Sequence, residues 1–583
     1  FGVHLIDETN LTKKQTQYLS DYFDVNILLH LQPMLLASQR IQPFLQNDQL
    51  YLAVKLAYKS SKSSATKKRV LHSYAIVKIP THYQPRFLQL PVENGNHYII
   101  FLDDVVRAFL YKIFPGFNII SSFSFKITRD AELYIEDEFQ GNLLQKITKS
   151  LNKREVGAPC RFTYDSSMPK PFLKFLLNFL GLSKNDLFPG GKYHNFSDFF
   201  SFPNPTKRAL VLDKLVPNKI KELEGGVNLF DEISRREFLF NFPYHSYDHV
   251  LNLLKQSAED PLVTTIKITQ YRVAKKSEVI KYLLRAANNG KEVVVFVELK
   301  ARFDEEQNIK FAQQMEKAGI NVLYSFPGLK VHSKILQITR KEGKRFKNYS
   351  YLGTGNFNES TARIYSDIGL FTADTRLTEE VEKVFQVLAG KKINYNFKHL
   401  LVAQFNMRKD FTKLIDNEIA NAKKGKEARM VIKMNSLEDK KMIDKLYEAS
   451  QAGVKIEMII RGICCLIPGI KDLSENISAI SIVDLYLEHS RIFIFHNGGK
   501  TKYYASSADW MRRNLNRRIE VAFPIYDKNL QKIMKDIINI QLSDNIKARI
   551  LDKSLSNKYK TTKAEKPIQA QIATYTYFKL KEG

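Results

Sequence analysis

One arrangement of hydrophobic and polar positions occurs twice along the chain. It consists of apolar residues at helical spacing, a short interruption that ends in glycine, and then a continuous run of β-branched and aromatic residues. The first copy occupies 279–297 with Gly290 at the interruption, and the second occupies 442–460 with Gly453 there. Each copy therefore predicts a helix, a turn and a buried strand.

The two copies continue with residues of matching chemistry. Each has a histidine, a cation two positions later, a strand-like run, a turn of small residues and a carboxylate. In chain order these are His332, Lys334, 335–338, 353–356 and Asp367 in the first copy, and His489, Arg491, 492–495, 506–509 and Glu520 in the second. Asn356 precedes Asp367 by 367 − 356 = 11 positions, and Asp509 precedes Glu520 by 520 − 509 = 11. The repeat predicts two related α/β halves.

The part of the chain before the repeat has a different pattern. Strand-like runs at 50–56, 75–79 and 98–102 alternate with helical ones such as 170–180, and a polar Ser/Lys stretch at 59–68 predicts a hairpin tip or loop. The fold class that we predict is α/β and α+β multidomain. An α+β head domain at 1–215 precedes the two α/β domains at 216–398 and 399–583.

The composition indicates a polyanionic partner and excludes several classes of protein. The 583 residues include 89 Lys and Arg against 61 Asp and Glu, so the formal charge is +28 and favours binding of phosphate-rich molecules. Three cysteines are too few for a disulfide framework, and no apolar run is long enough to span a membrane. Phe1 is not an initiator methionine, so we expect that the natural protein begins further upstream.

Paired histidines in such surroundings are suited to phosphoryl transfer. A neutral imidazole can attack phosphorus, a carboxylate can orient its second nitrogen, and nearby cations can neutralise the phosphoryl oxygens. A second imidazole can donate or accept a proton near neutral pH. Asp367 and Glu520, at matching offsets, are the orienting carboxylates that the duplication predicts.

The repeated pattern resembles the HxK…GSxN…E signature of the phospholipase D superfamily, but with informative departures. Thr339 replaces the usual acidic residue after Lys334, and His496 stands at the corresponding place after Arg491. The second half also has Arg491 for Lys and Asp509 for Asn. A phospholipase D-like phosphodiesterase is therefore an alternative that fits less well.

A closer resemblance, over nearly the whole chain, is to bacterial polyphosphate kinases of the first type. The matching runs are ITQYRVAK at 268–275, VELKARFDE at 297–305, GLKVHSK at 328–334, GTGNFN at 353–358, TARIYSD at 361–367, SADWM at 507–511 and, in the head domain, PGGKYHNF at 189–196. The resemblance implies reversible transfer of the ATP γ-phosphate to inorganic polyphosphate through a phosphohistidine. It also implies Mg²⁺ as the cofactor.

Residue roles follow from the resemblance at the matching positions. His332 matches the phosphorylated histidine, and His489 matches a second essential histidine that serves as acid/base or stabiliser. Tyr365 and Arg461 match nucleotide-phosphate contacts. Arg272 and Arg302 match positions assigned to magnesium, but a guanidinium cannot ligate a cation, so we interpret both as phosphate clamps near the metal. The further nucleotide- or phosphate-binding residues that we predict are Lys334, Asn356, Arg363 and Arg491.

The partners implied are ATP or ADP and inorganic polyphosphate, with a homodimer or homotetramer as the assembly and no nucleic acid. A cytoplasmic location, with peripheral association at the inner membrane, is also implied. Members of the family carry a helical N-terminal domain that helps to hold adenine, and we expect this chain to begin near or after the end of that domain. A basic scaffold that binds polyanions without turnover is the remaining alternative.

Overall fold

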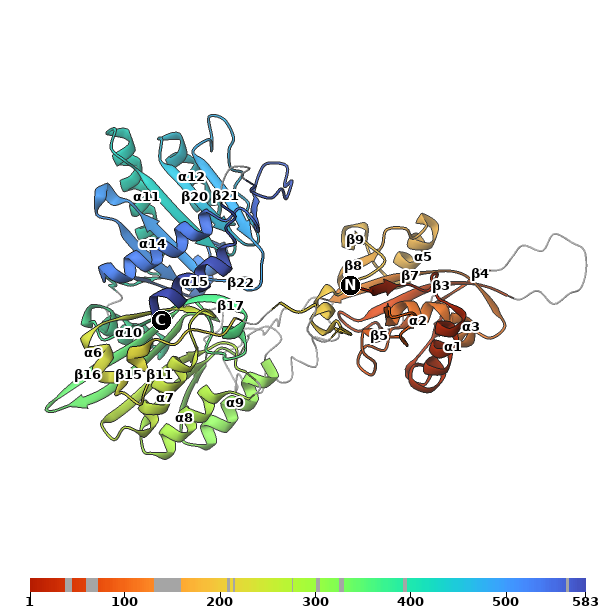
Figure 1. Cartoon of the computed structure of the whole chain (residues 1–583), viewed down its shortest axis with the longest axis horizontal. Coiled ribbons are helices and arrows are strands. Elements are labelled where there is room, and N and C mark those ends of the chain that lie inside the picture. Colours follow the sequence, from red (N-terminus) through yellow and green to blue (C-terminus); the bar gives the residue numbers. More distant parts are fainter. Residues whose placement is uncertain are drawn as a thin grey trace, which may run out of the picture. The chain divides into compact units, whose positions relative to one another are not determined.

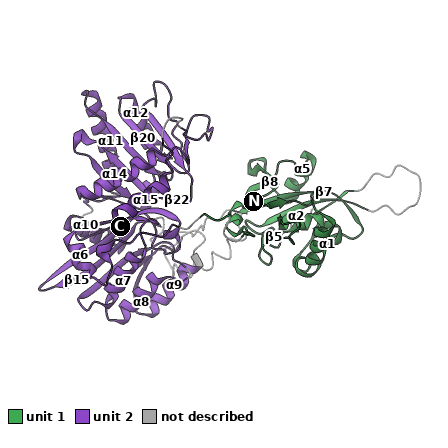
Figure 2. Ribbon diagram, in the orientation of Figure 1, with its two compact units in different colours: residues 1–213 green, residues 214–583 purple. Residues whose placement is uncertain are grey.

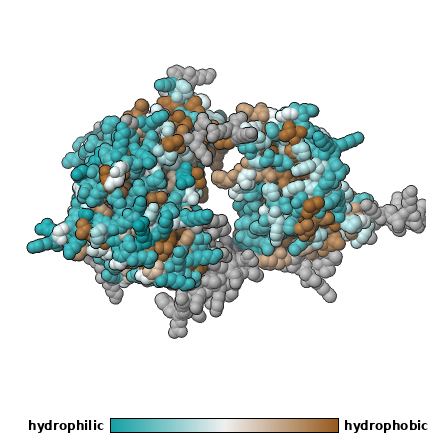
Figure 3. Space-filling view, turned by 60° about the horizontal axis from the view of Figure 1, so that its bottom comes forward, coloured by the Kyte–Doolittle hydropathy of each residue, from teal (hydrophilic) through white to brown (hydrophobic). Residues whose placement is uncertain are grey.

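The computed structural model describes residues 1–36, 44–58, 72–129, 159–206, 210–212, 215–274, 276–299, 305–324, 330–391, 396–561 and 566–582. These residues form two compact units, Phe1–Asp213 and Lys214–Gly583, coloured green and purple in Figure 2. On the face shown in Figure 3, hydrophilic residues cover most of the coloured surface, and hydrophobic residues form small separate patches. Within the described residues, no helix combines the length and apolar character that crossing a membrane requires.

The first unit is α+β. Its six-stranded sheet has the order β2-β4-β3-β7-β8-β9, and a smaller sheet has the order β1-β6-β5. The strands are β1 (Val3–Ile6), β2 (Met34–Leu35), β3 (Leu50–Tyr58), β4 (His72–Lys78), β5 (Phe87–Gln89), β6 (His97–Phe101), β7 (Phe117–Arg129), β8 (Pro159–Asp165) and β9 (Leu187–Gly190). The helices are α1 (Lys13–Tyr22), α2 (Leu102–Ala108), α3 (Leu110–Ile113) and α5 (Lys170–Leu180). The loop predicted at 59–68 lies outside the described residues.

The second unit contains the repeat as two sheets of the same order. The first sheet runs β10-β17-β16-β15-β11-β12-β13, and the second runs β18-β26-β24-β23-β19-β20-β21-β27. The first set of strands is β10 (Phe238–Phe242), β11 (Val263–Gln270), β12 (Glu292–Val297), β13 (Asn321–Tyr324), β15 (Lys334–Glu342), β16 (Arg345–Gly353) and β17 (Tyr365–Thr372). The second set is β18 (Leu401–Val402), β19 (Arg429–Met434), β20 (Lys455–Ile460), β21 (Ile477–Ile482), β23 (Arg491–Phe495), β24 (Lys502–Ser506), β26 (Val521–Pro524) and β27 (Ala548–Ile550). The predicted fold class, an α+β head followed by two related α/β halves, is confirmed.

The helices of the first half are α6 (Leu229–Arg235), α7 (Asp248–Glu259), α8 (Glu278–Asn288), α9 (Glu305–Lys317) and α10 (Thr375–Leu388). Those of the second are α11 (Met407–Lys423), α12 (Lys440–Gln451), α13 (Arg512–Arg517), α14 (Lys528–Leu542) and α15 (Ala570–Glu582). A helix connects the first two parallel strands of each sheet, α8 between β11 and β12 and α12 between β19 and β20, whereas β12 and β13 are joined by a helix and β20 and β21 by a loop. α8 begins after a serine cap and α12 after an aspartate cap, and each ends just before the left-handed glycine, Gly290 or Gly453, that the sequence predicts.

The two halves share one hydrophobic core, which explains why they form a single unit. Leu370 and Val384 of the first half belong to the same buried cluster as Val521 and Ile537 of the second, together with Phe578 of α15. Figure 1 shows α15, in dark blue, between the two halves near β17 and β22 (Leu487–Glu488). The cluster includes residues from several strands of both sheets and from α10, α14 and α15, so burial of this shared apolar surface holds the two halves together.

Candidate active site

His332 is delivered by a short strand that pairs with the opposite half. β14 (Lys330–Val331) runs parallel to β25 (Arg518–Ile519), with Val331 opposite Ile519. The backbone N–H groups of His332 and Ser333 both donate to the Ile519 carbonyl, each at 3.0 Å. The next residue along the second half is Glu520, whose Oε2 lies 2.9 Å from His332 Nδ1.

His489 is delivered by the matching contact in the opposite direction. β22 runs parallel to the start of β17, with Glu488 opposite Ser366. The N–H groups of His489 and Ser490 donate to the Ser366 carbonyl at 3.1 and 2.7 Å. His489 Nδ1 then lies 2.9 Å from both carboxylate oxygens of Asp367. Each histidine is therefore oriented by the carboxylate of the other half.

A hydroxyl holds each carboxylate in place. Thr354 Oγ1 donates to Asp367 Oδ1 at 2.6 Å, and Ser507 Oγ donates to Glu520 Oε2 at 2.6 Å. Asn514 Nδ2 adds a bond of 2.7 Å to Glu520 Oε1. These donors are neutral, so they do not cancel the charge of either carboxylate. Each carboxylate charge therefore acts on the Nδ1 side of its histidine ring.

The turn before Asp367 requires a glycine for reasons of space. A Cβ added at Gly355 would lie 2.3 Å from Asp367 Oδ2, far closer than atoms can approach. In the second half, Ala508 occupies the equivalent place, and the carboxylate there belongs to the longer side chain of Glu520. The small-residue turn is thus part of what positions the carboxylate.

Burial keeps both histidines neutral. It lowers the pKa of His332 and of His489, and the nearby cations Lys334 and Arg491 lower the pKa of His489 further. Burial alone would raise the pKa of Asp367 and of Glu520, but their contacts with the histidines and cations outweigh burial and lower it. An ionised carboxylate accepts the Nδ1 proton, so we assign the lone pair of each ring to Nε2.

Two buried basic side chains lie beside the rings. Burial lowers the pKa of Lys334 far below its usual range; its Nζ donates to the His332 carbonyl and lies 5.3 Å from the centre of the Tyr271 ring. Arg491 is held by Asp509 through two bonds of 3.2 and 3.0 Å. One of its nitrogens also lies 3.3 Å from His489 Nε2. This arrangement is suited to an anionic ligand beside both imidazoles.

Other predicted site residues lie at the same edge of the sheets. Tyr365, the first residue of β17, packs its ring 5.2 Å from that of His489. Arg461 directly follows β20 and donates from Nε to Asn435 Oδ1 at 3.0 Å. Arg272 follows β11, so it also lies at the carboxyl end of a parallel strand, where α/β folds place their ligands.

The remaining predicted site residues are Asn356, Arg363 and Arg302. Asn356 is half-buried, and its Oδ1 is itself buried and accepts no hydrogen bond from the described residues. Arg363 is exposed on a short 3₁₀ turn just before Tyr365. Arg302 lies outside the described residues.

The structure adds residues that sequence reasoning missed. Tyr271 sets its ring edge-on against His332 with centroids 4.7 Å apart, and Asn435 donates to the His489 carbonyl at 3.2 Å. Thr354 and Ser507 were visible only as members of small-residue turns. A signal did exist for these two hydroxyls, since each precedes its carboxylate by thirteen positions (367 − 354 and 520 − 507).

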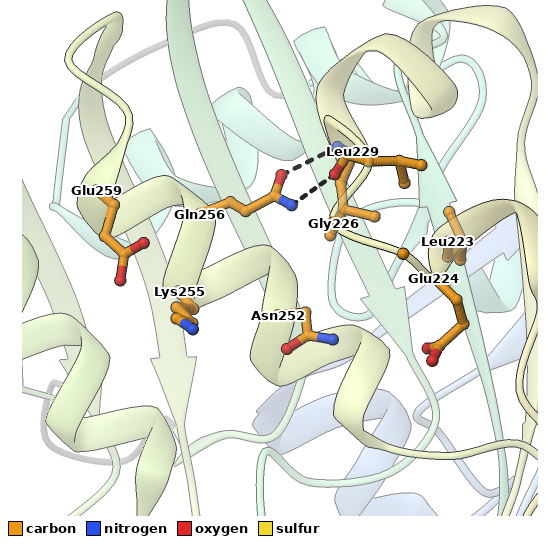
Figure 4. A pocket seen from close by; sticks show the side chains of 10 residues that line it. Leu223, Glu224, Gly226, Leu229, Asn252, Lys255, Gln256 and Glu259 are labelled. Carbon is orange, nitrogen blue, oxygen red and sulfur yellow. Dashed lines mark hydrogen bonds between the residues drawn. The ribbon is translucent and has the colours of Figure 1, made fainter.

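A separate pocket in the first half has no connection with these residues. Its cavity of about 350 Å³ lies between α7 and the loop 223–229. Gln256 bridges the pocket's rim by bonds to the Val227 carbonyl and the Leu229 N–H, while Lys255 and Glu259 extend from the same helix (Figure 4). None of the histidines or carboxylates described above lines it. Its mixed charges favour neither phosphate nor metal.

The fold and the crossed histidine–carboxylate pairs define a duplicated α/β enzyme of the phosphoryl-transfer class. Comparison with known proteins identifies the family. The polyphosphate kinase middle domain matches residues 14–202, C-terminal domain 1 matches 228–394, and C-terminal domain 2 matches 400–571. The chain belongs to the polyphosphate kinase family.

Individual relatives support this assignment over the whole chain. A polyphosphate kinase of Vibrio parahaemolyticus is 43% identical over 99% of this chain and 82% of its own length. That of Escherichia coli K12 is 42% identical over 99% of this chain and 84% of its own length. The crystal structure of polyphosphate kinase from Porphyromonas gingivalis superimposes with a TM-score of 0.85 at 41% identity, covering 100% of this chain and 85% of that one. The phosphodiesterase and non-catalytic alternatives are therefore set aside.

Proposed function

We propose that the kinase reaction passes through a phosphohistidine at His332. Nε2 attacks the γ-phosphorus of ATP, an N–P bond forms, and the bond from phosphorus to the β,γ-bridging oxygen breaks as ADP leaves. A terminal oxygen of polyphosphate then attacks the same phosphorus and the N–P bond breaks. The observation that carries the proposal is the Glu520 carboxylate 2.9 Å from His332 Nδ1, since it directs the lone pair to Nε2 and stabilises the positive charge that attack creates on the ring.

His489 acts as acid and base in this scheme. The His489 ring is neutral without ligand, so its Nε2 can take a proton from the terminal phosphate of the acceptor and return it in the reverse direction. Asp367 stabilises the imidazolium that then forms. Arg491 lies close enough to His489 Nε2 to turn from the ring to a phosphoryl oxygen when the ligand enters.

The remaining cations bind the phosphate oxygens. Lys334 and Arg491 serve the transferring group, while Arg272, Arg302 and Arg461 clamp the other phosphates of nucleotide and acceptor through forked hydrogen bonds. Tyr365, Asn356 and Arg363 complete the set of nucleotide and phosphate contacts.

Mg²⁺ enters with ATP and is treated as part of the substrate. Among the described residues, no three His, Cys, Asp or Glu side chains cluster so as to hold a metal ion, and the site near the histidines is rich in cations. A triphosphate supplies its own oxygen ligands, which is the usual mode for Mg²⁺. The metal then neutralises charge on the phosphates while the arginines bind the remaining oxygens.

Assembly and location are also proposals. We propose a homodimer or homotetramer in the cytoplasm with peripheral association at the inner membrane; sedimentation and cell fractionation test both. The division at 215 and 398 into a head and two catalytic domains stays a prediction.

The test of the phosphohistidine uses γ-labelled ATP. The wild-type chain should acquire label that is labile in acid and stable in base, and His332→Ala should acquire none. Addition of unlabelled polyphosphate should discharge the labelled enzyme. Label that persists in His332→Ala would place the intermediate elsewhere and overturn the assignment.

A further inference from the structure

The strand that carries His489 is held by a side chain of the C-terminal helix. Gln571, in the first turn of α15, accepts a hydrogen bond from the Tyr486 N–H at 2.8 Å and donates to the Tyr486 carbonyl at 2.8 Å. One glutamine amide thus occupies both backbone groups of Tyr486, as a neighbouring strand would. Gln571 is fully buried, so water cannot replace these bonds.

The same amide reaches the residue directly before His489. Gln571 Nε2 lies 2.8 Å from Glu488 Oε1, and the other oxygen of Glu488 accepts from Lys433 and, at 3.2 Å, from Gln541. Glu488 and Lys433 are both almost completely buried. Removing one partner from such a network costs far more than losing an exposed bond, so the position of Glu488 is strongly determined.

The first half anchors its histidine differently. There the Val331 N–H donates to Glu298 Oε2 at 2.9 Å, and Glu298 directly follows β12 of the same half. Among the described contacts, α15 therefore supports the strand before His489 but not the strand before His332.

We propose that Gln571 is a positioning residue for His489, which it holds against Asp367 through Tyr486 and Glu488. This inference rests on the proposed function, because it assumes that His489 takes part in phosphoryl transfer. Gln571 itself does not contact the reacting atoms. Its loss should misplace one imidazole and leave the other in position.

The helix has other anchors, so the effect of Gln571 can be separated from docking of α15. The Ala570 N–H donates to Asp544 Oδ2 at 2.6 Å, and the Phe578 ring packs 4.2 Å from that of His245. Thr574 lies one turn beyond Gln571 on the same buried face, and its hydroxyl makes no hydrogen bond to any described residue. Thr574→Val is therefore a matched control of equal burial.

The experiment compares Gln571→Met with Thr574→Val in the full chain. Gln571→Met keeps the volume of the side chain but loses all three bonds. We expect kcat to fall about tenfold or more with KM within about twofold, because small displacements of a catalytic group slow the reaction strongly. Thr574→Val should keep the wild-type kcat. Gln571→Asn, whose amide is one methylene shorter, serves as a second variant if Gln571→Met does not fold.

A double-mutant cycle shows whether Gln571 acts through His489. In a His489→Ala background, Gln571→Met should have no further effect on the residual rate. An equal fall in that background, or an equal fall in Thr574→Val, would overturn the proposal. Full activity of His489→Ala alone would instead refute the proposed role of His489, so the two failures are distinguishable.

The pH dependence of kcat distinguishes this role from a loss of stability, because a loss of stability alone would not shift it. The charged groups that act on His489 are Asp367, Arg491 and Lys334, and burial lowers its pKa. Loosening the strand exposes the ring and raises that pKa toward 6.5. The acid limb of the kcat profile should therefore move to higher pH in Gln571→Met and stay in place in Thr574→Val; an unmoved limb in both contradicts the proposal.

Discussion

Replacing Glu520 by glutamine would keep the size of the side chain and remove its charge beside His332. In the structure the carboxylate accepts hydrogen bonds from His332, Ser507 and Asn514, and it forms an ion pair with Arg518 at 3.5 Å. Glutamine has only one acceptor oxygen, so its NH₂ group must face either the ring or the other donors. When it faces the ring, His332 must carry its proton on Nε2 and loses the lone pair that attacks phosphorus.

The size of the effect follows from the distance between the charges. Two unit charges 2.9 Å apart attract by about 6 kcal/mol at an effective dielectric constant of about 20. The ring gains only part of a charge in the transition state, so about half of this attraction, about 3 kcal/mol, is lost. That loss corresponds to a rate about 100-fold lower.

Single-turnover labelling with γ-labelled ATP measures this rate directly. Glu520→Gln should form the phosphoenzyme about 100-fold more slowly than wild type. Ser507→Ala, which removes one neutral donor but keeps the charge, should slow it less than about tenfold, as expected for about 1 kcal/mol. Equal rates in wild type and Glu520→Gln would refute the reasoning, since the carboxylate would then have no part in activating His332.

Four further outcomes follow from the same geometry. Asp367→Asn should leave the thermal midpoint within a few degrees of wild type yet slow phosphoenzyme formation, and unchanged single-turnover kinetics would count against it. Gly355→Ala should lower kcat, because the added Cβ would lie 2.3 Å from Asp367 Oδ2 and would displace that carboxylate. Ala508→Gly should have only a small effect on kcat, and equal kinetics of the two variants would contradict the steric argument. Burial lowers the pKa of His332 to about 3, so its ring signal in NMR spectra of histidine-labelled protein should stay that of a neutral imidazole from pH 8 down to pH 6. Burial also lowers the pKa of His489, so its ring should titrate below the free value of about 6.5, and titration of either ring near that value would show exposed rings. Chelation by EDTA should abolish turnover but leave the thermal midpoint unchanged, as expected for a metal that arrives with ATP; a large fall in the midpoint would indicate a resident ion.

The fold was predictable where local pattern and packing agree. The helices α8 and α12 follow directly from apolar spacing and from the glycines that end them, and equal spacing from Asn356 to Asp367 and from Asp509 to Glu520 identified the two carboxylates. These signals are local, and the duplication repeats each of them.

The crossing of the pairs was not predictable, because it depends on contacts between distant segments. Only the pairing of β14 with β25 and of β22 with β17 places Glu520 at His332 and Asp367 at His489. Gln571 gave no signal either, since a glutamine in an amphipathic helix is ordinarily a surface residue.

A crystal structure with a non-hydrolysable ATP analogue tests the central claim most directly. We predict His332 Nε2 about 3–3.5 Å from the γ-phosphorus and in line with the bond to the β,γ-bridging oxygen. His489 should contact the same phosphoryl group. A γ-phosphate bound out of reach of His332, or His489 turned away from it, would contradict the account.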